Sequence, residues 1–265
     1  AFSLILLVVK YRKKLEYLFL IIIIPLGLGY LILLLPNYVP DEGSHIAKTY
    51  TVSEFDLFPN KNKDDEPIMK VPIQLEANSM SEINSYQDID YIMSKKTNYN
   101  KKINTNSVSA VSYFPIMYLI PSIGLNIGKV LNFNIYTGIY LAQALNLIFF
   151  VFTGFYVLKK IPFGKLLMFT YMLTPMMLQQ ATSCSADNFI NCTILLFVTY
   201  ILSIRFDDKV KEISLRQSII LGILMLFISC SKIVYLPLCF LVFLLYNKLK
   251  NSPKLVKTII TCSLL

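Results

Sequence analysis

The sequence predicts an all-α polytopic membrane protein. Of its 265 residues, 55% are hydrophobic, and the mean hydropathy is +0.58. Charged residues make up only 15% of the chain, whereas soluble domains carry roughly 25%. Apolar runs long enough to cross a bilayer recur along the sequence, and clusters of lysine and arginine separate several of them.

The first predicted span is Leu15–Leu35, in which Glu16 at the edge is the only charge. A transmembrane helix needs about 20 such residues. Four basic residues precede it, which places its N-terminal side in the cytoplasm. A cleaved signal peptide does not fit, because its apolar core would have roughly 7–15 residues. The chain begins without methionine and ends in an apolar stretch, so we expect residues 1–265 to be a single membrane domain from a longer protein.

Residues 36–133 are predicted to form a long first extracytoplasmic loop that bears helices on the membrane surface. Eleven of the chain's 16 acidic residues fall within residues 36–110, which is typical of a segment exposed to water. A short helix is predicted at Ile46–Phe58, with Ser44 as its cap.

Val108–Leu131 is apolar, but Pro115 and Pro121 interrupt it. Proline removes a backbone donor and clashes with the preceding helical turn. We therefore predict one or two helices that lie along the membrane surface, with a kinked span as the alternative.

Further apolar runs predict the later spans. They are Tyr136–Leu158, Leu166–Ala186, Asn188–Ile204, Gln217–Ser231 and Ile233–Asn247, with a seventh starting near Leu255. The two runs beside Lys232 are either two short spans or one long helix with a buried lysine. The first option, with Val108–Leu131 on the surface, places 15 of the 25 basic residues on cytoplasmic turns, as the positive-inside rule requires. The net charge of +9 then lies next to anionic lipid, so no nucleic-acid partner is expected.

This threading places three polar sites on the outer face. The first contains Asp41, Glu42 and His45, the second Asp187, and the third Lys232. A carboxylate could deprotonate an acceptor hydroxyl, and a lysine could neutralise a phosphate leaving group. Ionisable groups at membrane depth are functional candidates by default.

Each candidate also has a purely structural interpretation. Asp41 and Glu42 could begin a surface helix, and His45 could pair with Asp41 on one helical face. Asp187 could cap the fourth span, and Lys232 could extend to the membrane interface. One histidine cannot make a multi-histidine metal site, but a divalent cation held by Asp41, Glu42 and Asp187 stays open.

Several motifs resemble one family. Pro40-Asp41-Glu42-x-x-His45, after the first span, is similar to the bacterial domain-of-unknown-function family 2142, whose members resemble the GT-C membrane glycosyltransferases. Later blocks resemble that family in the same order: Tyr113–Tyr118, Ser185–Asp187 and Ser231–Pro237. Protein O-mannosyltransferases have a similar acid-rich motif in the first loop, and the aminoarabinose transferases of lipid A have a comparable layout.

The resemblance implies a GT-C-like helical bundle in a multi-pass protein of the bacterial cell membrane. It implies an inverting glycosyltransferase that moves a sugar from a polyprenyl-phosphate donor to a cell-envelope glycan or lipid, on the extracytoplasmic face. Asp41 and Glu42 would be the catalytic pair, with Asp41 as the base. The substrate-binding residues would be His45, Asp187, Lys232 and Tyr113. A transporter of lipid-linked precursors and a non-catalytic scaffold of an envelope assembly complex are the alternatives.

Overall fold

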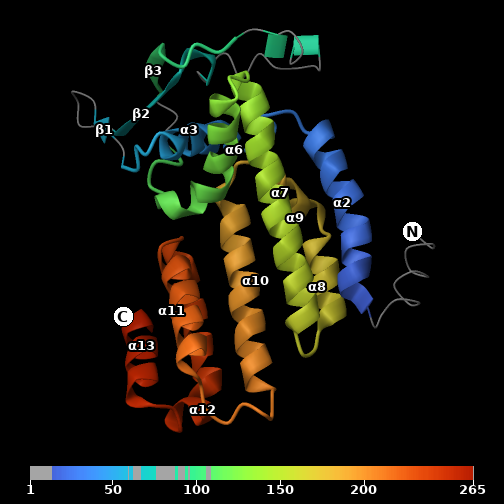
Figure 1. Cartoon of the computed structure of the whole chain (residues 1–265), viewed down its shortest axis with the longest axis vertical. Coiled ribbons are helices and arrows are strands. Elements are labelled where there is room, and N and C mark those ends of the chain that lie inside the picture. Colours follow the sequence, from blue (N-terminus) through green and yellow to red (C-terminus); the bar gives the residue numbers. More distant parts are fainter. Residues whose placement is uncertain are drawn as a thin grey trace. The chain divides into compact units, whose positions relative to one another are not determined.

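The computed structural model describes residues 14–58, 60–61, 67–75, 87–88, 93–94, 96–105 and 109–264 (Figure 1). Within them the chain is mostly helical and divides into two compact units. We call the unit that contains residues 23–150 and 174–189 the loop unit. The other, the terminal unit, contains residues 14–22, 151–173 and 190–264.

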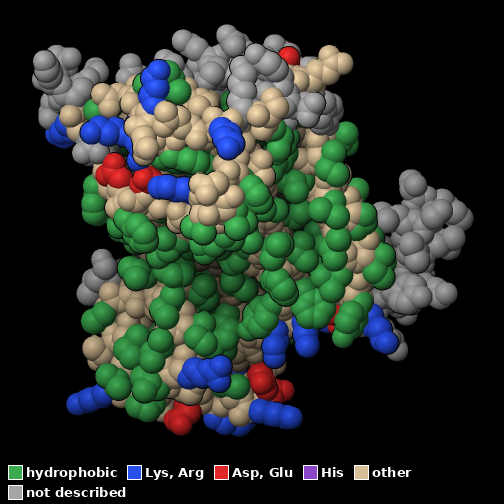
Figure 2. Space-filling view, turned by 45° about the horizontal axis from the view of Figure 1, so that its top comes forward, with side chains coloured by type: hydrophobic (Ala, Val, Ile, Leu, Met, Phe, Trp, Pro, Cys, Tyr) green, Lys and Arg blue, Asp and Glu red, His purple; other side chains and the backbone are tan. Residues whose placement is uncertain are grey.

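Four helical segments in the described part of the chain have the length and composition to cross a membrane. They are α2 (Leu15–Leu33), α7 (Ile135–Lys160), α10 (Ala186–Arg205), and the continuous pair η4 (Ile233–Leu245) and α12 (Tyr246–Lys250). The helices predicted for the first, second and fourth spans are thus confirmed to within two residues at each end. Large apolar side chains of α2 are exposed, including Ile21 and Leu33, and Figure 2 shows hydrophobic side chains over much of the face in view.

The prediction of a continuous third span at Leu166–Ala186 is wrong. Two short helices, α8 (Lys165–Met172) and α9 (Pro175–Ala181), occupy that stretch. The break precedes Pro175, which disfavours the helical conformation of the residue before it. Thr174 accordingly has an extended backbone, with φ −66° and ψ 146°.

The two runs beside Lys232 form separate helices rather than one long helix. Three residues separate helix α11 (Leu215–Ser229) from η4, and the last of them, Lys232, is the N-cap residue of η4. A capping box fixes the start of α11, because the side chains of Ser214 and Gln217 each accept a hydrogen bond from the other's backbone N–H. Helix α13 (Lys254–Leu264) lies where the seventh span was expected to begin.

The first loop contains helix and sheet. Helix α3 (Glu42–Ser53) starts four residues before the predicted helix, and Ser44 is buried inside it instead of capping it. A small antiparallel sheet that the sequence did not predict follows, in the order β1 (Asn60–Lys61), β2 (Pro67–Pro72), β3 (Lys102–Thr105), with η2 (Ile73–Leu75) after β2. The prediction of an all-helical fold is therefore corrected by this three-stranded sheet in the first loop.

The described part of the apolar stretch predicted at Val108–Leu131 contains two short helices, η3 (Pro115–Tyr118) and α6 (Leu119–Val130), as predicted. Their place on a membrane surface remains a prediction. Helix α6 packs against the first turns of α7 at backbone distance, because a Cβ at Gly124 would lie 2.4 Å from the Ala142 nitrogen. Glycine is required here because no side chain fits between the two helices.

Candidate functional site

The turn that starts α3 separates two adjacent carboxylates. Asp41 has a left-handed backbone, with φ 60° and ψ 4°, a conformation that aspartate tolerates better than most residues. Its carbonyl accepts hydrogen bonds from the backbone N–H groups of Ser44 (3.0 Å) and His45 (3.3 Å). The Asp41 side chain is exposed, whereas Glu42 is only 1% exposed. The two acids of the motif therefore have different environments.

The Glu42 carboxylate joins the nearby Asn37 to two distant segments of the loop unit. Its Oε1 accepts hydrogen bonds from Gln143 Nε2 on α7 (2.9 Å) and from the Cys184 backbone N–H (3.2 Å). Its Oε2 accepts from the Asn37 backbone N–H (2.9 Å). Burial raises the pKa of Glu42, and these hydrogen bonds offset only part of that effect. The geometry favours a positioning role for Glu42 over contact with a substrate.

His45 and two tyrosines form an aromatic cluster next to Asp187. The His45 Nδ1 and the Tyr118 hydroxyl are 2.7 Å apart, and the His45 ring centroid lies 5.6 Å from that of Tyr113. Burial raises the pKa of Tyr118, and the nearby Tyr113 and Asp187 raise it further. The structure therefore pairs Nδ1 of His45 with Tyr118, not with Asp41 as the helical spacing suggested.

Asp187 lies in the first turn of α10, where a negative charge is favourable. Its backbone N–H donates to Ser185 Oγ (3.2 Å), so Ser185 caps the helix, the role that the structural interpretation gave to Asp187. Asn146 on α7 anchors this segment. Its Nδ2 donates to the Ser183 carbonyl (2.7 Å), and its own carbonyl accepts from Asn188 Nδ2 (3.0 Å).

The chain matches the DUF2142 family, described as predicted membrane proteins, over residues 6–265. The chain belongs to this family. The match confirms the resemblance seen in the motifs and the assignment to membrane proteins. No curated protein and no solved structure matches the chain.

The loop unit of this DUF2142 protein brings together most of the predicted site. The segments that carry Asp41 and Asp187 meet where Glu42 accepts the Cys184 N–H. His45 and Tyr113 belong to the same unit. The remaining predicted residue, Lys232, is half-buried at the start of η4 and belongs to the terminal unit.

Sequence reasoning missed the neutral groups that hold the site together. Gln143 and Asn146 are each 2% exposed and lie within the otherwise apolar α7. Buried amides in a span are unusual and mark a hydrogen-bonded site, so their position was the available signal. The backbone donors of Asn37 and Cys184 leave no such trace in the sequence.

Metal binding finds no support in the described residues, which contain no group of three histidine, cysteine, aspartate or glutamate side chains placed to hold an ion. Both oxygens of Glu42 already accept hydrogen bonds. A cation shared by Asp41, Glu42 and Asp187 would have to replace those contacts.

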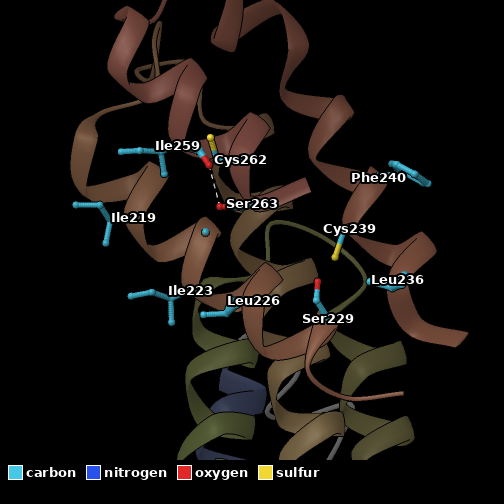
Figure 3. Close-up of a pocket in the computed structure, with 11 residues that line it drawn as sticks. Ile219, Ile223, Leu226, Ser229, Leu236, Cys239, Phe240, Ile259, Cys262 and Ser263 are labelled. Atoms are coloured by element: carbon cyan, nitrogen blue, oxygen red, sulfur yellow. Dashed lines mark hydrogen bonds between the residues drawn. The ribbon is translucent and has the colours of Figure 1, made fainter. Parts of the chain in front are cut away.

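The terminal unit contains a separate cavity of about 780 Å³ between α11, η4 and α13 (Figure 3). Among the described residues, its lining includes Leu226, Leu236 and Phe240 but no aspartate, glutamate, histidine, lysine or arginine. The hydroxyls of Ser229 and Ser263 donate to carbonyls of their own helices. The described lining therefore offers two thiols, Cys239 and Cys262, but no carboxylate, imidazole or amine for acid–base chemistry.

Proposed function

We propose that this protein is a membrane glycosyltransferase with a GT-C-like arrangement, which transfers a sugar from a polyprenyl-phosphate donor to a cell-envelope glycan or lipid. The reaction would take place on the extracytoplasmic face of a bacterial cell membrane. One observation carries the proposal: an exposed carboxylate, Asp41, is held by a fixed turn next to a buried carboxylate that ties it to the segment of a third acid, Asp187.

Asp41 is the proposed catalytic base. As the acceptor hydroxyl attacks the anomeric carbon, its proton passes to the Asp41 carboxylate. The bond from the anomeric carbon to the phosphate oxygen breaks, and polyprenyl phosphate leaves with the electron pair. A positioned base of this kind contributes typically 10²–10⁴-fold to the rate.

The neighbouring residues have supporting roles in this proposal. Glu42 fixes the turn that carries Asp41, through its three hydrogen bonds. The half-buried Tyr113 and Asp187 and the buried His45 are proposed to contact the acceptor or the sugar, because aromatic rings and carboxylates suit the faces and hydroxyls of sugars. The family resemblance assigns Lys232 to the donor phosphate, where its charge would stabilise the leaving group.

The Asp41→Asn variant tests the proposal. In cells that lack the protein, polyprenyl-phosphate-linked sugars are expected to accumulate in organic extracts analysed by mass spectrometry. The wild-type protein removes this excess, whereas Asp41→Asn leaves it, since the amide cannot accept the proton and the rate falls by roughly 10²-fold or more. Because the Asp41 side chain is exposed, the variant should match the wild type in amount and in thermal stability in detergent.

The matched control is Asp208→Asn, which removes an exposed carboxylate from the terminal unit. It should restore the lipid-linked pool as well as the wild type does. Full restoration by Asp41→Asn would remove this residue from the mechanism, and an unchanged pool in the cells without the protein would refute the proposed substrate.

A further inference from the structure

The chain segment after α3 exposes an unusual group of apolar side chains. Phe55 is 84% exposed, Phe58 71% and Leu57 36%, although α3 itself is almost entirely buried. Single exposed apolar residues are ordinary on protein surfaces, whereas contiguous ones mark an interaction site. We call Phe55, Leu57 and Phe58, which flank the half-buried Asp56, the apolar tip.

The apolar tip is braced rather than loose. Phe55 has a left-handed backbone with φ 59°, which is rare for a bulky residue, and its N–H donates to the Val52 carbonyl (3.0 Å). The buried Lys48 donates to the Leu57 carbonyl (3.2 Å). Both contacts hold the tip in the orientation that presents its phenylalanines outward.

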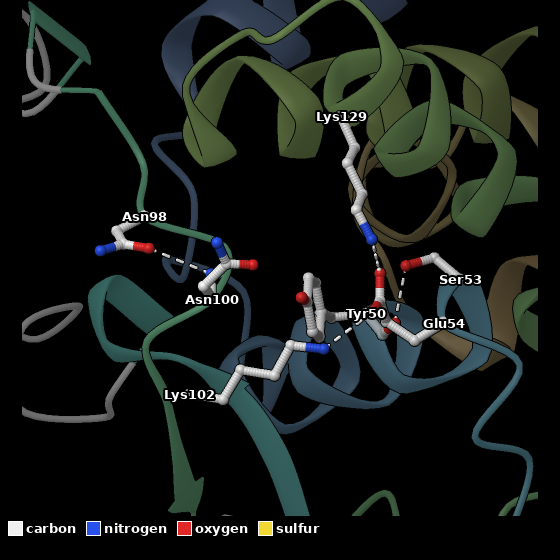
Figure 4. A network of polar contacts seen from close by, with 7 residues as sticks. All are labelled: Tyr50, Ser53, Glu54, Asn98, Asn100, Lys102 and Lys129. Carbon is white, nitrogen blue, oxygen red and sulfur yellow. Dashed lines mark hydrogen bonds and ion pairs between the residues drawn. The ribbon is translucent and has the colours of Figure 1, made fainter.

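Glu54, just before the apolar tip, ties it to two other elements (Figure 4). Its carboxylate pairs with Lys102 of β3 at 2.8 Å and with Lys129 in the last turn of α6. The Lys102 ammonium also lies 5.4 Å from the centre of the Tyr50 ring. The Lys129 pair places the tip beside the C-terminal end of α6.

Helix α6 exposes an apolar stripe of its own. Leu119, Ile123 and Ile127 recur every four residues, so they share one face of the helix, and they are 41–53% exposed. Val130 and Leu131 extend the exposed surface at the helix end, with exposed fractions of 78% and 55%. Through the ion pair of Glu54 and Lys129, this end of the stripe adjoins the apolar tip.

Helix α6, which carries the stripe, packs beside a candidate membrane span. The opposite side of α6 packs on α7, a candidate membrane span, through Gly124 against Ala142 and Gly128 against Gly138. Helix α6 therefore lies beside the first turns of α7, where a span of that length reaches the membrane interface, and its exposed face points away from α7. Lys102 and Lys129 together carry one positive charge more than their shared partner Glu54, and such an excess suits anionic lipid headgroups.

We propose that the apolar tip and the outer stripe of α6 form one membrane-docking surface, on which Phe55 and Phe58 enter the acyl-chain boundary of the lipid bilayer. The tip would thereby fix the height of α3 relative to the membrane. This inference is independent of the proposed glycosyl transfer, because it concerns the C-terminal end of α3 and uses no site residue.

Tryptophan fluorescence tests this proposal, because the chain contains no tryptophan. The Phe55→Trp variant keeps a large aromatic side chain at an exposed position, so the fold should be retained. The purified protein is reconstituted into vesicles of phosphatidylethanolamine and phosphatidylglycerol. We expect emission at shorter wavelength than in water, strong quenching when the acyl chains are brominated, and little quenching by aqueous iodide.

Two further variants calibrate the measurement. Asn100→Trp places the reporter at an exposed polar position of the same loop, and Phe152→Trp places it at a 70% exposed position on the candidate span α7. The proposal predicts that Phe55→Trp resembles Phe152→Trp. Quenching by iodide equal to that of Asn100→Trp would overturn it. So would emission at short wavelength without quenching by bromine, since the tip would then contact protein instead of lipid.

Discussion

Helix α3 carries a glutamate at each end, and the two have opposite electrostatic environments. Glu42 accepts hydrogen bonds from three neutral donors, and burial raises its pKa. Burial would also raise the pKa of Glu54, but its hydrogen bonds to Lys102 and Lys129, and their charges, lower it instead. One residue type on one helix therefore shows both directions of shift, and the partners decide which direction wins.

The two ends of α3 should therefore differ in how their contacts respond to dissolved salt. The contacts of Glu42 are buried and short in range, so dissolved salt should hardly affect them. The ion pairs of Glu54 are partly exposed, with 20% of its side chain open to solvent, so salt should screen them. The N-terminal end holds a site in place, and the C-terminal end holds an apolar surface in place.

The largest effect is expected for Glu42→Ala. The change leaves the buried N–H groups of Gln143 and Cys184 and the half-buried N–H of Asn37 without an acceptor. A buried unsatisfied group costs about 1–3 kcal/mol, so the total loss should be about 4 kcal/mol. A thiol-reactive dye can follow thermal unfolding in detergent, because Cys184 and Cys192 are buried until the protein unfolds. Glu212→Ala, at an exposed position, is the control. Equal midpoints for both variants would show that the Glu42 network contributes nothing to stability.

A smaller effect is expected for Glu54→Gln, on the order of 1 kcal/mol at pH 7, because partly exposed ion pairs are screened by solvent. The folded pKa of Glu54 is lowered from 4.5, so its contribution is present above that value and is lost as pH falls through the folded pKa. The variant should therefore match the wild type at sufficiently acid pH. The pH dependence at Glu42 runs the other way: because its folded pKa is raised, the wild type loses stability as pH rises above 4.5. A Glu54 deficit that persists unchanged in acid would contradict this account.

The smallest effect is expected for Lys102→Met, about 0.3 kcal/mol. The Lys102 side chain is 32% exposed, and Lys129 remains to pair with Glu54. The difference from the wild type should shrink as salt is added, when unfolding is measured at low and at high ionic strength. Lys101→Met removes an exposed neighbouring charge and should change nothing. A larger loss at Lys102, independent of salt, would point to the Tyr50 ring contact instead of the ion pair.

Hydropathy was sufficient to predict the long helices, because a run of about twenty apolar residues is typical of a transmembrane helix. It failed at residues 166–186, where Pro175 divides an uncharged run that looked continuous. It also misplaced the start of α3. The helix begins after the left-handed turn at Asp41. A serine at Ser44 resembled a cap and predicted a later start, whereas the turn at Asp41 could not be seen in the sequence.

The residues of the candidate site could be predicted from the sequence, but their environments could not. Acids and a histidine next to a span are visible in the sequence, so Asp41, Glu42 and His45 could be found. Their division of labour could not, because the exposure of Asp41 and the burial of Glu42 depend on contacts with Gln143 and Cys184 far along the chain. Such contacts follow from tertiary packing and leave no local pattern.

The bond between Glu42 and the Cys184 N–H also sets an order of events during synthesis, because the two residues are 142 positions apart. At about 5–20 residues per second, roughly 7 to 30 seconds elapse between the translation of one partner and the other. Throughout that interval the Glu42 carboxylate of the nascent chain lacks at least its Cys184 donor. A cell that makes this protein therefore handles an unfinished site during translation, and a chaperone or insertase that shields the carboxylate would act within this interval.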